Sequence, residues 1–190
     1  QVTNYPWDGT IRLSVTVPKA TTFTLKLRIP SWTQNQPVPG DLYNHVDMLD
    51  KQVAVTVDGE TAPINLEDGY ATISRQWSNT TEIEITMPMP VRRVIADHQV
   101  GELVGKVALE RGPIVYAIET ADNPDGVLER VLNDQDQLTT EHRSEVLQGI
   151  TLIKGSTENE QGDSFNFVAI PYYAWGHRDI GEMTVWLNRK

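Results

Sequence analysis

Cysteine is absent from this chain of 190 residues. The absence excludes disulfides, thiolate nucleophiles and thiolate metal ligands together. The sequence has four scattered histidines, none at ligand spacing from another: His45, His98, His142 and His177. Because a zinc site needs about three or four protein ligands, only a site assembled across loops from histidines and carboxylates would remain. We therefore predict no metal and no cofactor, and we expect these histidines on the surface or at interfaces.

Long apolar runs and clusters of basic residues are also missing. No run approaches the roughly 18–20 apolar residues of a membrane span, and the formal net charge is −10. Residues 1–95 carry 8 basic and 10 acidic side chains, a net of −2, whereas residues 96–190 carry 8 and 16, a net of −8. Nucleic-acid binding requires clustered Lys and Arg. We therefore predict neither a nucleic-acid nor a membrane partner.

Motifs of nucleophilic and phosphoryl chemistry are likewise absent. The sequence has no Gly-x-Ser-x-Gly elbow and no glycine-rich phosphate loop. Glycoside hydrolysis usually needs two acidic groups, but 26 acidic residues give no basis for choosing a pair. Glu102, Glu110 and Glu119 lie near the 105–118 segment, and we expect them to be solvated charges on strand faces. The sequence therefore predicts no catalytic residue.

Period-two alternation of apolar and polar residues is the dominant pattern that the sequence does contain, and it is typical of half-buried strands. The first series of such runs lies at 11–17, 23–29, 53–57, 64–66, 70–73 and 83–87. A second series begins after 91–95 and lies at 107–110, 114–118, 127–132, 150–153, 165–170 and 183–187. Strands at this spacing predict an all-β fold of two consecutive antiparallel β-sandwich, jelly-roll-like domains. We place the first domain at residues 1–95 and the second at 96–190.

Three segments interrupt the strand pattern. Thr33–Asp50 contains four turn-forming residues and predicts a long loop. Asn133–Gln148 is the one stretch where we expect a short helix. Ser156–Asp163 is acidic and polar, which indicates an exposed loop.

The aromatic stretch Ala169–Arg178 is the strongest candidate for a functional surface. Pro171 and Gly176 break the strand there, so the intervening side chains are expected on a bend. We favour an interface or structural corner over ligand contact, and the candidate binding residues are Tyr172, Tyr173, Trp175, His177 and Arg178. The other tryptophans that lie near strand ends are expected to plug the rims of the first domain: Trp7, Trp32 and Trp77.

Several segments, taken in order across the chain, resemble the C-terminal part of the β-L-arabinofuranosidase family of glycoside hydrolases, family 127. They are Tyr5–Gly9, Leu27–Trp32, Gly69-Tyr70, Met87–Arg92, Gly105–Tyr116 and Ala169–Arg178. The resemblance implies β-sandwich domains that follow an (α/α)₆ helical catalytic barrel. The family's catalytic glutamate and its cysteines lie in that barrel and match no residue here, so no catalytic residue carries over.

The resemblance implies a non-catalytic ancillary region of a larger enzyme of plant-glycan degradation, with the helical catalytic barrel of the same parent chain as its partner. This fragment would not be an enzyme. Because Gln1 is not a methionine, we interpret the chain as a processed or excised product of a parent of the exported kind, with no compartment assigned. The alternative is a carbohydrate-binding module for plant oligosaccharides, in which aromatic rings stack on sugars and Arg178 binds hydroxyls. A self-contained hydrolase with two facing acids is the third hypothesis.

Overall fold

The computed structural model describes residues 1–159 and 161–190, which form strands joined by turns and three short 3₁₀ segments. None of the helical segments in these ranges is long and apolar enough to cross a bilayer. The predicted all-β class is therefore confirmed. Residue 160, which falls in the loop predicted at Ser156–Asp163, lies outside the described residues.

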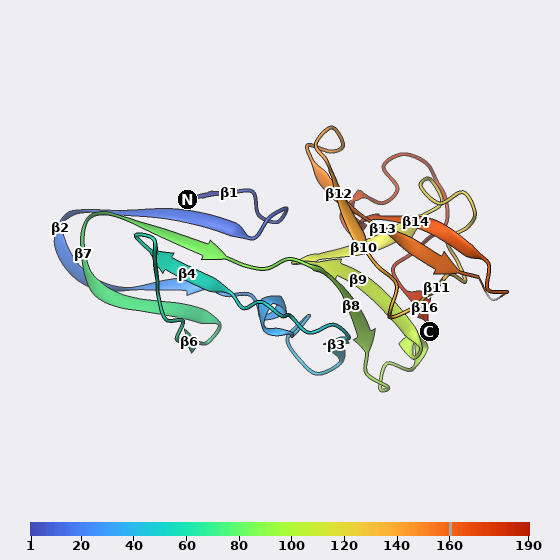
Figure 1. Cartoon of the computed structure of the whole chain (residues 1–190), viewed down its shortest axis with the longest axis horizontal. Coiled ribbons are helices and arrows are strands. Elements are labelled where there is room, and N and C mark those ends of the chain that lie inside the picture. Colours follow the sequence, from blue (N-terminus) through green and yellow to red (C-terminus); the bar gives the residue numbers. More distant parts are fainter. Residues whose placement is uncertain (160) are drawn as a thin grey trace. The chain divides into compact units, whose positions relative to one another are not determined.

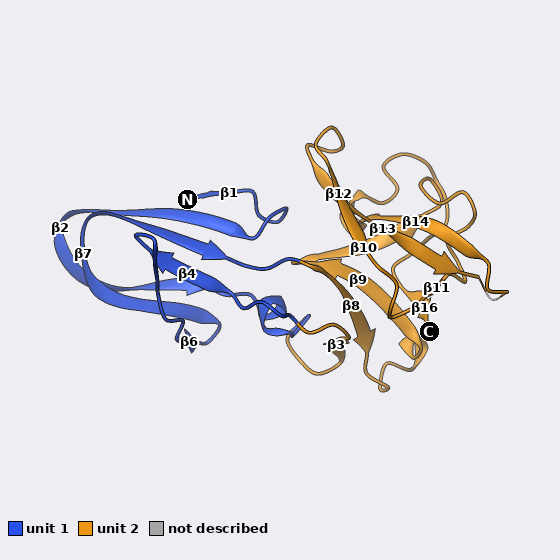
Figure 2. Cartoon of the chain, viewed as in Figure 1, with its two compact units in different colours: residues 1–38, 49–89 blue, residues 39–48, 90–190 orange. Residues whose placement is uncertain are grey.

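The chain divides into two compact units, coloured separately in Figure 2. Unit 1 contains residues 1–38 and 49–89, and unit 2 contains residues 39–48 and 90–190. The elements of unit 1 are β1 (Val2–Thr3), β2 (Thr10–Arg28), η1 (Ser31–Gln34), β4 (Ala54–Val57), β5 (Glu60–Thr61), β6 (Leu66–Glu67) and β7 (Tyr70–Thr86).

Unit 2 holds the remaining elements. They are β3 (Tyr43–His45), β8 (Val91–Ala96), η2 (Gly101–Leu103), β9 (Lys106–Arg111), β10 (Ile114–Glu119), β11 (Val131–Leu132), β12 (Thr139–Arg143), β13 (Ile150–Glu158), β14 (Ser164–Pro171), η3 (Tyr172–Ala174), β15 (Met183–Thr184) and β16 (Leu187–Arg189).

Unit 1 is built on two long antiparallel strands, β2 and β7, which curve together halfway along their length (Figure 1). The pairing register shifts between Val17 and Thr21, where Pro18 has no backbone N–H to donate. Asn79 faces this bulge with a positive φ of 55°. The bend brings the two halves of each strand over one another. The runs predicted separately at 11–17 and 23–29 are therefore one continuous strand.

The core of unit 1 lies inside this folded sheet. Trp77 has no exposed surface, and its ring stacks on Phe23 with centroids 5.3 Å apart. The indole Nε1 donates a hydrogen bond of 2.9 Å to the Phe23 carbonyl oxygen, which satisfies the one polar atom of this side chain. Trp32 is also in the core, at 6% exposed. These two tryptophans are therefore core residues of unit 1, while Trp7 is half-buried.

The sheet of unit 2 closes on itself. Successive pairings run β10–β14–β13–β11–β16–β9, and β9 also pairs with β10, which completes a ring of six strands. Strands β8, β12 and β15 pair with members of this ring, and β3 pairs with β8. All pairings within the ring are antiparallel except that of β11 with β16. A closed ring has no free edges, unlike two sheets packed face to face. A sandwich in this unit therefore stays a prediction.

Three segments differ from their sequence predictions, and one of them is the loop expected at Ser156–Asp163, whose first three residues belong to β13. Within the expected loop at Thr33–Asp50, β3 pairs with β8, with His45 opposite Val94. The Tyr43 ring stacks near that of Trp186 at 6.1 Å. The expected helix at Asn133–Gln148 instead contains β12, which pairs with β13 over five residues. Strand β3 is fixed by a partner distant in sequence, so local patterns do not predict it. Strands β12 and β13 are consecutive and form a hairpin that begins at the pair of Arg143 with Ile150.

Strand β8 also joins unit 2 rather than unit 1. It pairs with β9 from Val91 opposite Arg111 to Val94 opposite Ala108. Arg92 and Arg93, both buried, are adjacent on this strand. The Arg92 side chain donates to the Asp47 carbonyl oxygen from Nε at 3.2 Å and Nη2 at 2.6 Å. The Arg93 Nη2 donates to the Asp136 carbonyl oxygen at 2.5 Å. The segment 39–48 is thus tied to β8 through side chains as well as through β3.

Candidate functional site

The residues singled out in the C-terminal part form one exposed turn, which we call the aromatic turn (Tyr172–Arg178). Strand β14 ends at Pro171, and the chain then makes one 3₁₀ turn in which the Trp175 N–H donates to the Tyr172 carbonyl oxygen at 3.2 Å. Ala174 faces inward at 1% exposed. The neighbouring aromatic side chains therefore face outward, with 50%, 60% and 45% of their surfaces exposed for Tyr172, Tyr173 and Trp175 respectively.

Two of these rings form a single platform. The Tyr172 and Trp175 rings are stacked with centroids 6.4 Å apart and planes inclined by 15°. Offset stacking of this kind fixes both rings relative to each other. Exposed aromatic surface that is held in place is typical of sites that contact a protein or a sugar. The structure thus brings Tyr172 and Trp175 together, while their role as binding residues stays a prediction.

A carboxylate at the end of β10 anchors the other end of the aromatic turn. Glu119 is 3% exposed and accepts hydrogen bonds from the Gly176 N–H at 3.1 Å and from Arg178 Nη2 at 2.5 Å. Arg178 Nη1 also donates to Asp122 Oδ1 at 2.9 Å, and its Nη2 contacts Asp122 Oδ2. Hydrogen bonds with Asp122, and more weakly with Glu119, raise the pKa of Arg178 above its ordinary value despite partial burial.

This arrangement changes what Arg178 can do. Its Nη1 and Nη2 groups already bind two carboxylates, and charge-assisted hydrogen bonds of this kind are stronger than hydrogen bonds to a neutral hydroxyl. Arg178 therefore holds the turn in place, while its predicted role as a binder of sugar hydroxyls stays untested. His177 is exposed and closes the turn locally, because its Nδ1 contacts the Ala174 carbonyl oxygen.

A buried tyrosine lies beneath the aromatic turn. Tyr116 is 1% exposed, and its Cα is paired with that of Pro171. Burial raises the pKa of Tyr116 to about 12; Tyr173 adds to this rise and Arg111 opposes it. Burial also raises the pKa of Tyr173. Both phenols are therefore neutral near pH 7, and the surface of the turn carries no tyrosinate charge.

The acidic residues near the 105–118 segment are not all solvated as expected. Glu102 is exposed, but Glu110 and Glu119 are 8% and 3% exposed. Glu110 Oε1 contacts Nε2 of His45, whose side chain is fully buried, so the expectation of a surface or interface position was wrong for this histidine. Burial of these carboxylates is tolerated because each has a partner, His45 for Glu110 and Arg178 for Glu119.

The acidic side chains next to the aromatic turn are engaged by other groups of unit 2. Within residues 1–159 and 161–190, no group of three or more His, Asp or Glu side chains is arranged to hold a metal ion. Glu119 and Asp122 both bind Arg178. The aromatic turn can bury apolar surface area against a partner.

The fold and the family models define this chain as an all-β stretch of a glycoside hydrolase. The model described as the β-L-arabinofuranosidase GH127 middle domain matches residues 1–89, and the model described as the glycoside hydrolase family 127 C-terminal domain matches residues 91–188. The chain belongs to glycoside hydrolase family 127.

Relatives of known structure and curated function agree with this assignment. The chain is 28% identical to a non-reducing end β-L-arabinofuranosidase of Bifidobacterium longum subsp. longum, covering 100% of this chain and 30% of the relative. A GH127 β-arabinofuranosidase structure aligns with a TM-score of 0.88 at 37% identity, covering 100% of this chain and 31% of that one. The structure of a GH127 β-L-arabinofuranosidase from Geobacillus stearothermophilus T6 aligns with a TM-score of 0.86 at 38% identity. This alignment covers 100% of the present chain and 30% of that one. The chain thus spans about 30% of the length of these relatives.

Proposed function

We propose that this chain is a non-catalytic ancillary region of a longer GH127 enzyme that acts on β-L-arabinofuranosides of plant glycans. The observation that carries the proposal is the joint match to the family's middle and C-terminal domains, over about 30% of the relatives' length. Unit 1 would serve as a β-sandwich built from one folded sheet. Unit 2 would serve as the second, sandwich-like domain, with its sheet closed.

The aromatic turn supports a role in docking the helical catalytic barrel of the same parent chain. Tyr172, Tyr173 and Trp175 expose apolar surface, while Arg178 and Glu119 fix the turn at its base. A rigid aromatic patch loses little conformational entropy when it is buried against a partner. The carbohydrate-binding alternative is less favoured, because Arg178 is occupied by carboxylates and both matching models describe domains of the hydrolase itself.

The non-catalytic role is tested by assaying the 190-residue chain alone on an aryl β-L-arabinofuranoside. We expect no turnover above buffer, and any reproducible turnover that tracks the protein would contradict the proposal.

Docking is tested in a chimera in which this chain replaces the corresponding region of the Geobacillus enzyme. We expect a Tyr172→Ala and Trp175→Ala double variant to lower the thermal midpoint of the chimera by several degrees while leaving that of the isolated chain within about one or two degrees. Tyr70→Ala, which removes an exposed tyrosine of unit 1, is the matched control. Equal shifts in the chimera and in the isolated chain would exclude docking as the role of the turn.

A further inference from the structure

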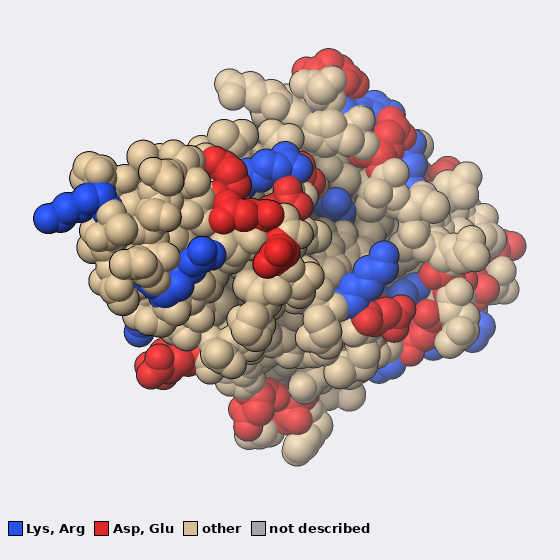
Figure 3. Space-filling view, turned by 60° about the vertical axis from the view of Figure 1, so that its left-hand side comes forward, with Lys and Arg blue, Asp and Glu red and all other residues tan. Residues whose placement is uncertain are grey.

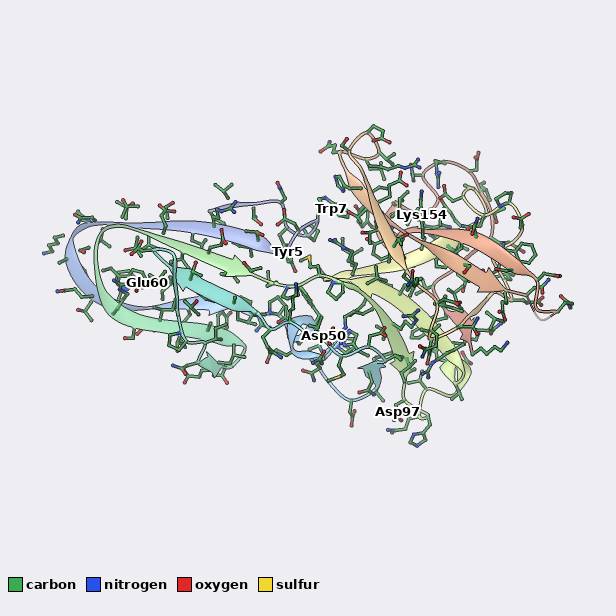
Figure 4. The ribbon with its side chains drawn as sticks, viewed as in Figure 1. Tyr5, Trp7, Asp50, Glu60, Asp97 and Lys154 are labelled. Carbon is green, nitrogen blue, oxygen red and sulfur yellow. The ribbon has the colours of Figure 1, made fainter. Side chains whose placement is uncertain are left out.

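A second surface feature of unit 2 lies on strands β12, β13 and β14 and shares no lining residue with the aromatic turn. It is a recess with a volume of about 520 Å³, a size in the range of small-molecule sites. Figure 4 labels Lys154, which projects from this part of unit 2. We call the feature the β12–β14 recess; the residues of its lining that concern us are Gln137, Thr139, Lys154, Ser156, Asn166 and Val168.

The pairing register explains why these side chains share one face. Thr139 pairs with Lys154, which in turn pairs with Val168, so these three form one row across β12, β13 and β14. Ser156 pairs with Asn166 and forms a second row, two residues further along. Residues two apart on a strand point to the same side. The two rows therefore present hydroxyl, amide and ammonium groups on the same side of the sheet.

Gly155 and Phe167 form the base between the two rows. They are opposite each other in the register, and Phe167 is 2% exposed. A Cβ atom on Gly155 would lie 2.8 Å from Leu138 Cδ2 and 2.9 Å from Phe167 Cε1, closer than real contacts allow. Glycine is therefore required here. It lets apolar side chains pack directly behind the strand, which keeps the base of the recess rigid.

The polar groups of the recess are largely unused by the protein. No side chain of Gln137, Ser156 or Asn166 makes a hydrogen bond to another residue of the described ranges. Lys154 Nζ contacts Glu141 Oε2, and the hydrogen bonds from Lys154 and then Arg143 hold the pKa of Glu141 below its usual value. The Lys154 charge is thereby matched by an ionised carboxylate. An ammonium has three N–H donors, so Lys154 still has donors to offer.

This chemistry selects a class of ligand. The two amides and the Ser156 hydroxyl can each donate and accept, and the Thr139 hydroxyl, which donates to the Lys154 carbonyl oxygen at 3.5 Å, can still accept. These groups suit a ligand whose own groups are hydroxyls. An anion is disfavoured because Glu141 neutralises the one cation and the whole chain carries a net charge of −10. Charged side chains of both signs are interspersed on the face that Figure 3 shows. A cation is disfavoured because the lining contains no carboxylate.

We propose that the β12–β14 recess binds a neutral oligosaccharide through Gln137, Ser156 and Asn166. We expect this oligosaccharide to contain arabinose, and that choice of sugar rests on the proposed function. The inference that the recess binds a neutral oligosaccharide does not depend on the proposed function. Such a site would hold a remote part of a glycan while another domain acts on its end.

The test is a titration of the isotope-labelled 190-residue chain with an L-arabinofuranosyl oligosaccharide, followed by amide chemical shifts. We expect saturable shifts at β12–β14 with a dissociation constant in the millimolar range. Asn166→Leu should weaken binding about tenfold, because it leaves a ligand hydroxyl unpaired. Ser156→Trp should abolish binding by filling the recess. Gln52→Leu, which removes an exposed amide of unit 1, is the matched control and should bind like the parent chain.

Three results would overturn the proposal: no saturable shifts up to about 0.1 M sugar, shifts centred on Tyr172 and Trp175 instead, or equal shifts with inorganic phosphate. None of them bears on the ancillary role, because the fragment assay and the chimera leave the recess unchanged. Conversely, turnover by the fragment would remove the proposed function while leaving the binding result intact.

Discussion

Unit 1 and unit 2 are both all-β, but they remove their apolar surface from water in different ways. Unit 1 folds two strands of 19 and 17 residues over a core that contains Trp77. Unit 2 closes a ring from shorter strands, two of which, β11 and β16, have only two and three residues. Unit 1 therefore depends on a few long strands, and unit 2 on pairings that join distant parts of the chain.

The difference shows in burial along the strands. Strand β2 alternates between half-buried and exposed residues over most of its length, as expected for a sheet with one face in solvent. Strands β9 and β10 are buried at nearly every position. Both of their faces are covered, one by the interior of the ring. The alternation of apolar and polar residues in the sequence therefore predicts the strands of unit 1 better than those of unit 2.

Trp77→Ala tests whether the stability of unit 1 depends on the core around Trp77. Removing a fully buried tryptophan that stacks on Phe23 should cost about 3–5 kcal/mol. Hydrogen exchange measured by mass spectrometry should show lost protection in unit 1 and little change in unit 2. Thr22→Ala, on the exposed face of β2, should change the free energy of unfolding by less than about 0.5 kcal/mol. Equal loss of protection in both units would show that they unfold as one, and the comparison would fail.

Leu187→Ala tests the closure of the ring in unit 2. Leu187 is 3% exposed and pairs with Val107, at the point where β16 joins β9 to β11. Truncation of a buried leucine should cost about 2–5 kcal/mol. Protection should fall in β9, β11 and β16 together and not only beside the mutation. Val115→Ala, at an exposed position of the same ring, is the control. Loss confined to β16 would mean that the ring does not act as a unit.

The fold was predictable where strands were long and half-exposed. The alternation at 11–17, 23–29 and 83–87 is observed in β2 and β7. What alternation could not reveal is that the first two runs are one strand, because the bulge beside Pro18 resembles a turn in the sequence. Strand β3 is too short for any period, and its pairing depends on a partner far along the chain.

The candidate site was predictable only in part. Pro171 and Gly176 indicated a bend, and the exposed Tyr172 and Trp175 lie on one. The carboxylates of Glu119 and Asp122 that bind Arg178 come from 59 and 56 residues earlier in the chain, respectively, so no local signal pointed to them. The same holds for the β12–β14 recess. Ser156 was expected in a loop but lies in β13, where the pairing register places it beside Asn166.

The prediction with the smallest expected effect concerns surface ion pairs. It compares the contribution of one such pair in each unit to stability at acid pH. In unit 2, Arg189 of β16 donates two hydrogen bonds to Asp134, at 2.9 and 2.6 Å, and these bonds lower the pKa of Asp134 below its usual value. A carboxyl group whose pKa is depressed in the folded state contributes stability above its unfolded pKa. That contribution disappears as the pH falls through the folded pKa.

Asp134→Asn should therefore lower the free energy of unfolding by up to about 1 kcal/mol at pH 7 and flatten its decline between about pH 4 and pH 2. The matched variant in unit 1 is Glu84→Gln, which breaks the Arg12–Glu84 pair, and this pair is more exposed than the Arg189–Asp134 pair. It should change neither the stability nor its pH dependence measurably, because exposed pairs are screened by solvent and salt. Urea unfolding at a series of pH values measures both variants. If the two gave the same pH profile, the Asp134–Arg189 pair would contribute no more to ring closure at β16 than an isolated surface pair contributes to unit 1.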